Sequence, residues 1–325
     1  MYQIKQIPTD FVVKEISNFK IKDKGQYLIL KLKKENYNTL DAIKVVAQKL
    51  HIPTKDIGFA GSKDKRAITE QMISIKIGHH KEYLDSKLIK EKIKRLELRD
   101  IALEFLGYAS EPITLGDLVG NHFEIVIRNL SDFSFKTPGK ITNYFGEQRF
   151  GGNNIEIGKS IIKKDFQQAC ELIATQETKE HLARKKNDFV GAIRLIPKRL
   201  LRLYVNAYQS YLWNRTVKEL VQQKLKIDDV PLIGFATEFS GLPDELKKII
   251  KNNLEKEQIE LTDFIIKQIP NLSLEGSCRK VFVEVKNFKV LEKENDDLNS
   301  GKKKIKICFT LPKGSYATIV IKELF

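Results

Sequence analysis

The segment QYLILKLKKENYNTLDAIKVVAQKL, residues 26–50, changes its hydrophobic period halfway along. Between Leu28 and Leu32 every second residue is leucine, which is typical of a half-buried strand. From Asn38 onward apolar residues recur every three or four positions, as on one face of a helix, and Asn38 or Thr39 is suited to cap its start. The first 150 residues continue to alternate strand and helix signals in this way.

A glycine-rich turn, GFAGSKDKRAITEQ at residues 58–71, follows this helix and leads into a strand with period two. It sets the acid Asp64 among Lys63, Lys65 and Arg66, and these positive charges favour the ionised carboxylate. An ionised acid suits a nucleophile or an electrostatic stabiliser better than a general acid. The alternative is that Asp64 only caps its own turn through a following backbone amide, and the pattern leaves both readings open.

Several kinds of chemistry lack their sequence signature. The nearest other acids are Glu70, six residues after Asp64, and Asp56, eight residues before it, so neither the paired acids of a glycosidase nor the acids of a metal nuclease are evident. The sequence contains no GxxxxGK[ST] phosphate loop and no GxGxxG motif. We therefore expect no cofactor.

Charge points to a polyanionic partner. Among 325 residues, Lys and Arg number 57 and Asp and Glu 42, giving a net charge of +15 and an isoelectric point near 9.4. Such a balance favours nucleic acid, although a lysine-rich composition can also serve solubility alone. The length suggests two domains, or one domain with a large insertion.

The cysteines and histidines form no metal-binding pattern. Cys170, Cys278 and Cys308 are far apart and no CxxC pair occurs, which disfavours a zinc finger and a disulfide framework and fits a reducing cytoplasm. The adjacent His79 and His80 are interpreted as a loop. We expect no metal, and because no apolar run has the length of a signal peptide or a membrane span, we expect a soluble cytoplasmic protein.

The middle of the chain changes character. The segment NYFGEQRFGGNN, residues 143–154, places aromatic rings beside Arg149, which is common where proteins stack bases and hold phosphates but also occurs at ordinary domain junctions. Residues 159–280 then read mainly as helices. The aromatic residues of the strongest helix are interpreted as core rather than as a base-binding stripe. This predicted core group consists of four aromatic residues and one leucine: Tyr204, Tyr208, Tyr211, Leu212 and Trp213.

Two further predictions concern secondary structure. Residues 81–100 predict an amphipathic, net positive helix. Alternating apolar residues predict strands at 281–290, 304–311 and 317–324, so that strands at both ends of the chain enclose a helical middle. Since the terminal strands of one sheet commonly lie near each other, this order predicts an inserted domain.

Eight segments together resemble the TruD family of tRNA pseudouridine synthases, enzymes that isomerise the uridine at tRNA position 13. They occur in the family's order from residue 4 to residue 324. The segments are IKQIPTDFVVKEI, NTLDAI, DIGFAGSKDKRAITEQ, LGDLVGNHFEIVIRNL, NYFGEQRFG, AYQSYLWN, GSCRK and LPKGSYATIVIKEL. Any one of them could arise by chance, whereas eight in register are a specific signal.

The resemblance implies roles for individual residues. Asp64 would be the catalytic carboxylate that starts the cleavage of the N-glycosidic bond, by attack on the sugar, attack on the base or assistance to elimination. Lys5 would be its charge partner. Phe123 would stack on the target base, and Asn121 would position the catalytic loop or the base edge.

Three further residues are candidates for contact with RNA. They are Lys63 and Gln71 in the glycine-rich motif and Arg149 in the aromatic segment. A target uridine inside folded tRNA must be flipped out of its stack, and a basic surface offsets that cost through phosphate contacts.

The resemblance also implies the fold. We expect an α+β protein: a pseudouridine synthase catalytic domain with a mixed, largely antiparallel sheet, interrupted by a mainly helical inserted domain. The predicted boundaries are residues 1–152 and 283–325 for the catalytic domain and 153–282 for the insertion. Two alternatives stay open, a non-catalytic tRNA-binding protein of the same fold and a base-excising hydrolase. The sequence is compatible with a monomer but does not determine the oligomeric state.

Overall fold

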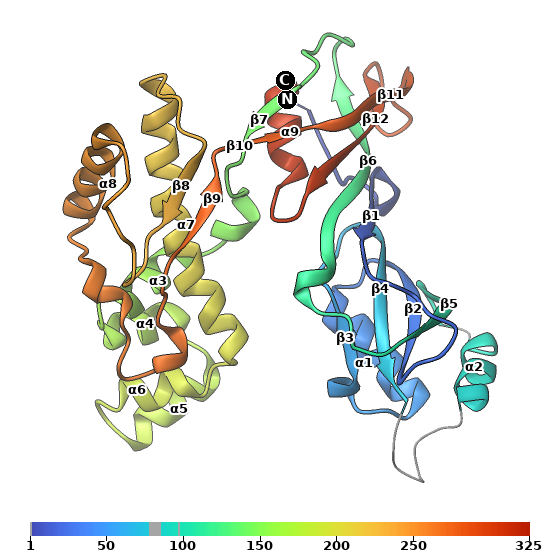
Figure 1. The fold of residues 1–325 in the computed structure, drawn as a ribbon, viewed down its shortest axis with the longest axis horizontal. Helices are drawn as coiled ribbons and strands as arrows, with labels where there is room; N and C mark the ends of the chain where they lie inside the picture. Colours follow the sequence, from blue (N-terminus) through green and yellow to red (C-terminus); the bar gives the residue numbers. More distant parts are fainter. Residues whose placement is uncertain (1, 78–85, 97) are drawn as a thin grey trace. The chain divides into compact units, whose positions relative to one another are not determined.

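The computed structural model describes residues 2–77, 86–96 and 98–325, which form two compact units (Figure 1). The sheet unit comprises Met1–Lys140 with Glu284–Phe325, and the helical unit comprises Ile141–Val283. The helical unit begins twelve residues before the expected boundary at 153, because Asn143 and Phe145 bond to residues farther along that unit. That the helical unit is the family's inserted domain stays a prediction.

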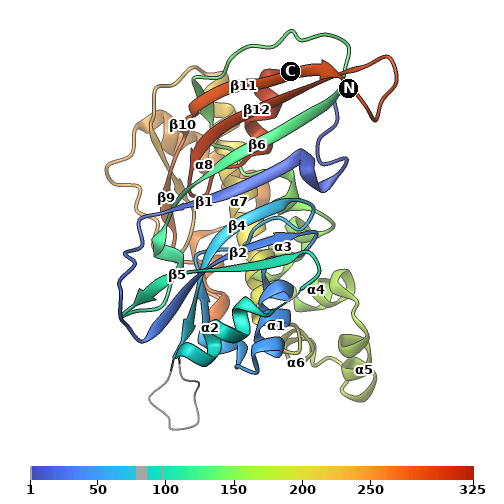
Figure 2. The same cartoon turned by 90° about the vertical axis from the view of Figure 1, so that its right-hand side faces the viewer.

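The sheet unit is built on an eight-stranded sheet with the order β11-β12-β6-β1-β4-β2-β5, in which β3 pairs with β4 (Figure 2). Among the described strands of this sheet, β1 and β4 are the only parallel pair, so the prediction of a mixed, largely antiparallel sheet is confirmed. The strands are β1 (Phe11–Ser17), β2 (Tyr27–Glu35), β3 (Ile57–Phe59), β4 (Ile68–Lys76), β5 (Ile101–Ala109), β6 (Leu118–Leu130), β11 (Lys286–Asn295) and β12 (Lys303–Pro312).

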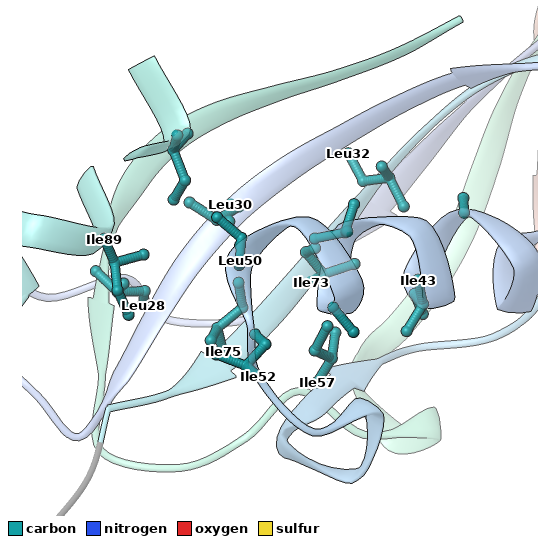
Figure 3. Packing of buried hydrophobic residues seen from close by; sticks show 14 of the residues in the cluster. Leu28, Leu30, Leu32, Ile43, Leu50, Ile52, Ile57, Ile73, Ile75 and Ile89 are labelled. Carbon is teal, nitrogen blue, oxygen red and sulfur yellow. The ribbon is translucent and has the colours of Figure 1, made fainter. Parts of the chain in front are cut away.

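Helix α1 (Thr39–Leu50) covers one face of the sheet over β2 and β4 (Figure 3). Its first turn is capped by the Asn38 side chain, which accepts a hydrogen bond from the backbone amide of Asp41, as the sequence predicted. The three leucines of β2 are fully buried under this helix. Ile29 is fully buried as well, in a second cluster with Ala109, so β2 is covered on both faces rather than half-buried.

The structure corrects one predicted strand. Residues 317–324 form helix α9 (Ala317–Leu324), although their alternating apolar residues predicted a strand. Ala317, Val320, Ile321 and Leu324 are all buried, and their spacing of three, one and three residues is that of one helical face. A short apolar run satisfies both periods, and tertiary packing decides between them.

Two other predicted elements have different bounds in the structure. The stretch 281–290 is divided between β10 (Phe282–Glu284), which pairs with β7 (Lys140–Thr142), and β11 of the large sheet. Within the predicted helix at 81–100, the described helical residues are those of α2 (Ser86–Lys94), and the described residues after Lys94 are not helical. His79 and His80 lie outside the described residues.

The helical unit packs around its longest helix, α7 (Lys198–Gln222). Tyr204, Tyr208, Leu212 and Trp213 are buried there as predicted, whereas Tyr211 is half-exposed. The other elements are α3 (Asn154–Ile162), α4 (Phe166–Ile173), α5 (Gln176–Arg184), α6 (Phe189–Arg194), α8 (Asp244–Glu257), β8 (Asp229–Leu232) and β9 (Ser277–Lys280). Across the described parts of both units, no helix combines the length and apolar character required to span a membrane.

Candidate active site

Asp64 lies on the connection between β3 and β4, and buried polar groups fix the backbone of this loop. The Gln71 side chain donates to the carbonyl of Gly61 at 3.0 Å and accepts from the Thr39 hydroxyl at 2.9 Å. The same hydroxyl oxygen accepts from the backbone amide of Lys63 at 2.9 Å. Gly61 has φ +127°, a conformation that favours glycine. Strand β4 and the start of α1 therefore hold the loop together.

The Lys63 ammonium forms a buried ion pair inside the sheet unit. It lies 2.6 Å from a carboxylate oxygen of Glu15, and the two side chains are only 5% and 2% exposed. The other Glu15 oxygen accepts from the backbone amide of Met72 at 3.2 Å. A buried pair satisfied in this way restrains the residue next to Asp64 and leaves little of the Lys63 charge at the surface.

Lys34 is a residue of the site that sequence reasoning missed. Its side chain is completely buried, and its ammonium donates to the backbone carbonyls of Asp64 at 2.9 Å and Tyr37 at 2.6 Å. Burial lowers the pKa of Lys34 to about 8, although the nearby Asp64 carboxylate acts in the opposite direction. The signal was present in the sequence, because Lys34 continues the two-residue spacing of the buried leucines of β2.

The Asp64 carboxylate itself is left accessible. Its side chain is 26% exposed, and the Lys5 ammonium lies 3.1 Å from Oδ2. This is its sole hydrogen bond among the described residues, so Asp64 does not cap its own turn through the amide of Lys65 or Arg66. The Lys5 ammonium also lies 4.0 Å from the centroid of the Phe11 ring, a cation–π contact that holds it beside the acid.

An ion cluster around Arg128 holds the segment that carries Lys5. The Arg128 guanidinium donates to Asp10, Asp296 and Asp297, each at 2.8 Å. Burial opposes ionisation of Asp296, but hydrogen bonds from the backbone amides of residues 129 and 298 and from Arg128 outweigh it and lower the pKa of Asp296 to about 2. The cluster ties the residues just after Lys5 to β6 and to the end of β11.

Asn121 and Phe123 lie on β6 next to β1, where Asn121 pairs with Glu15 and Phe123 with Val13. They share a sheet face because they are two residues apart. The Phe123 ring is 6% exposed and packs against Phe11 and Phe309, with centroid distances of 6.1 and 5.5 Å. The Asn121 side-chain oxygen is buried and accepts no hydrogen bond from any described residue.

Arg149 belongs to the helical unit, on the 3-10 helix Glu147–Phe150. Its guanidinium donates to the Ser210 hydroxyl at 3.1 Å and lies 5.3 Å from the centroid of the Phe145 ring. Of the seven residues singled out in the sequence, the six others all belong to the sheet unit.

Across residues 2–77, 86–96 and 98–325, no group of three or more His, Cys, Asp or Glu side chains is arranged to hold an ion. Cys170 and Cys308 are buried thiols, and Cys278 is exposed. The site instead offers an accessible carboxylate beside one ammonium on a fixed backbone, an arrangement suited to nucleophilic or electrostatic action on a bound molecule.

Comparisons with known proteins give a consistent result. The family model described as tRNA pseudouridine synthase D (TruD) matches residues 2–181, 176–231 and 229–324. The chain is 31% identical to a probable tRNA pseudouridine synthase D of Methanosarcina barkeri over 420 residues, covering 99% of this chain and 92% of that protein. It is 29% identical to the tRNA pseudouridine synthase D of Aquifex aeolicus over 395 residues, covering 99% and 98%.

A solved structure is similar as well. The crystal structure of the putative tRNA pseudouridine synthase D from Methanosarcina mazei matches with a TM-score of 0.71 and 28% identity, over 99% of this chain and 92% of that one. The alignments with the M. barkeri and A. aeolicus proteins are longer than the 325 residues of this chain, so segments of those relatives have no counterpart here.

Proposed function

Because the chain belongs to the TruD family of tRNA pseudouridine synthases, we propose that it isomerises uridine to pseudouridine at position 13 of tRNA, with Asp64 as the catalytic carboxylate. One observation carries the assignment of Asp64. Its backbone is fixed by buried groups, whereas its carboxylate is accessible and, within the described part of the chain, contacts the Lys5 ammonium alone.

The reaction requires no group beyond the chain's own side chains. A carboxylate oxygen of Asp64 starts the cleavage of the bond between N1 of uracil and C1′ of ribose. The uracil then turns, its C5 bonds to C1′, and loss of the C5 proton is balanced by protonation of N1. Atoms and charge are conserved, so an isomerase releases no base. The ammonium of Lys5 stabilises the negative charge on Asp64 between turnovers.

The remaining residues divide into three groups. Lys34, Lys63 and Gln71 bond inside the protein and position the loop, so we assign them to positioning. Asn121 offers a buried acceptor that could bind an N–H of the flipped base, and Phe123 forms an aromatic wall with Phe11 and Phe309. Arg149, in the helical unit, stays a candidate for contact with RNA.

The experiment is a test for pseudouridine at position 13 of an unmodified tRNA transcript, read as a carbodiimide-dependent stop of reverse transcription. The parent chain, Asp64→Asn and Asp23→Asn are compared, since Asp23 is an exposed acid of the same unit. The parent and Asp23→Asn should produce the stop, and Asp64→Asn should not.

Two outcomes would contradict the proposal. Binding of tRNA without any stop would identify a non-catalytic binding protein. Release of uracil with an abasic site would identify a base-excising hydrolase.

A further inference from the structure

Two aromatic motifs of the sequence meet at one pocket in the helical unit. The pocket has a volume of about 280 Å³, near the lower end of the range for small-molecule sites. Its lining residues come from the segment 143–154 and from α7. They are Tyr144, Phe150, Tyr211, Asn214, Arg215 and Lys218. None of them is acidic.

The aromatic segment is fixed to α7 by a reciprocal pair of hydrogen bonds. The Asn214 side chain accepts from the backbone amide of Phe145 at 2.9 Å and donates to its carbonyl at 3.0 Å. The Phe145 ring packs edge-on against Trp213 at 5.6 Å, and the Arg279 guanidinium lies 4.0 Å from the Phe145 centroid. The neighbouring Tyr144 is thereby held at the wall of the pocket.

The opposite wall is one face of α7, since residues 211, 214, 215 and 218 follow helical spacing. Glu257 of α8 fixes this wall: it accepts from the Tyr211 hydroxyl at 3.3 Å and from the Arg215 guanidinium. Burial acts to raise the pKa of Glu257, but Lys159 at 2.7 Å and Arg215 outweigh it and hold that pKa below its ordinary value. The aromatic and cationic groups are therefore in place before a ligand arrives, which reduces the entropy lost on binding.

The lining matches the chemistry of a nucleotide. Tyrosine and phenylalanine rings provide faces for a base, and arginine and lysine provide positive charge for a phosphate. The Lys218 side chain is exposed and makes no hydrogen bond or ion pair with any described residue, so its ammonium is available. We propose that this pocket binds one unpaired nucleotide of the substrate RNA, with the base among the rings and a phosphate on Lys218.

This inference rests on the proposed function for its ligand class, RNA, but the pocket is complete within the helical unit. It assigns a binding role to Tyr211, which the sequence placed in the core. An unpaired nucleotide is required because a base can enter between rings only when it is unstacked.

The test is the affinity of the whole chain for an unmodified tRNA transcript, measured across a series of salt concentrations. Tyr144→Ala should weaken binding about 5- to 150-fold, the range found when a stacking ring is removed. Lys218→Met should lower the slope of log affinity against log salt by about one, because one phosphate contact is lost. Lys226→Met, which removes another exposed lysine of the same unit, should leave both quantities unchanged.

The readouts separate this inference from the proposed function. Pseudouridine formation at saturating tRNA should stay within about twofold of the parent in Lys226→Met, because Lys226 does not line the pocket. If the parent forms pseudouridine while Tyr144→Ala and Lys218→Met bind tRNA as Lys226→Met does, the pocket assignment is overturned and the enzyme stands. If the parent forms no pseudouridine but the two variants lose affinity, the enzyme assignment is overturned and the pocket stands. Because Lys218 is exposed, its replacement tests the idea even if Tyr144→Ala fails to fold.

Discussion

Asp64 of the sheet unit and Glu257 of the helical unit are both acids placed beside basic side chains, yet their surroundings differ. The Asp64 carboxylate bonds to Lys5 alone among the described residues and is 26% exposed. The Glu257 carboxylate bonds to Lys159, Arg215 and the hydroxyls of Tyr208 and Tyr211, and it is 12% exposed.

The difference shows two ways of immobilising an acid. Glu257 is held through its carboxylate, whose hydrogen-bonding capacity is thereby used for structure. Asp64 is held through its backbone, by Lys34 at its own carbonyl and by Gln71 and Thr39 at the residues before it, so the carboxylate keeps capacity for chemistry. Removing the carboxylate should therefore have opposite consequences at the two positions.

The largest effect is expected from Asp64→Asn. Pseudouridine formation should fall at least about 10⁴-fold, as when a covalently acting side chain is removed. The midpoint of denaturant unfolding should change little, because Lys5 is the one described residue that bonds to the carboxylate. Activity and unfolding are measured on the same preparation. A large loss of stability would show that Asp64, like Glu257, is a structural acid.

Lys34→Met should come next, with a fall in kcat of about 10²-fold, the cost of a small misplacement of a reacting group. The variant removes the donor to the Asp64 carbonyl but retains a long apolar side chain in the buried site. The KM for tRNA should stay within about threefold, because Lys34 is buried and does not reach RNA. A change in KM without a change in kcat would refute a positioning role.

Glu257→Gln should reduce the free energy of unfolding by about 2 kcal/mol, since it leaves partly exposed cations without their acid. Because the folded-state pKa of Glu257 is lowered, its stabilisation is fully present above pH 4.5 and is lost as the pH falls through that pKa. Urea unfolding should therefore show a larger difference between parent and variant at pH 7 than at pH 3. The kcat of the folded variant should be unaffected.

The smallest effect concerns the pH dependence of stability at Lys34. The pKa of Lys34 is about 8 in the folded chain, compared with the ordinary value of 10.5, which we take for the unfolded chain. Between these two pH values the unfolded chain therefore binds one proton more than the folded chain. The free energy of unfolding contributed by Lys34 should then rise with pH, by at most about 1.4 kcal/mol per pH unit. Subtracting the Lys34→Met curve from the parent curve between pH 7 and 9.5 isolates this slope, and a flat difference would contradict the lowered pKa.

Much of the sheet unit follows from the sequence because its signals are local. The change of period between β2 and α1, the Asn38 cap and the glycine-rich turn are each contained in a few residues. The pairing of Lys5 with Asp64 came from resemblance alone, because no spacing rule connects residues 59 positions apart.

Other features of the structure could not be predicted from local sequence patterns, because they depend on residues far apart in the chain. The partner of Lys63 is 48 positions away, so the sequence suggested Lys63 for contact with RNA, although a buried carboxylate pairs with its ammonium. Residues 317–324 satisfy both the strand and the helix period, and only their packing reveals α9. The half-exposed position of Tyr211 depends on α8 and the aromatic segment, which lie far from it in sequence.

The Arg128 cluster has a consequence for the order in which the protein becomes active during its synthesis. Asp296 follows the whole helical unit in the chain, and it lies 168 positions after the arginine that it binds. While a ribosome is still making the helical unit, the segment bearing Lys5 lacks this anchor, and β6 lacks its neighbour β12. We therefore expect the candidate site to be completed only after residue 312 has been translated, because Arg128 lacks Asp296 and β6 lacks β12 until those segments have been made.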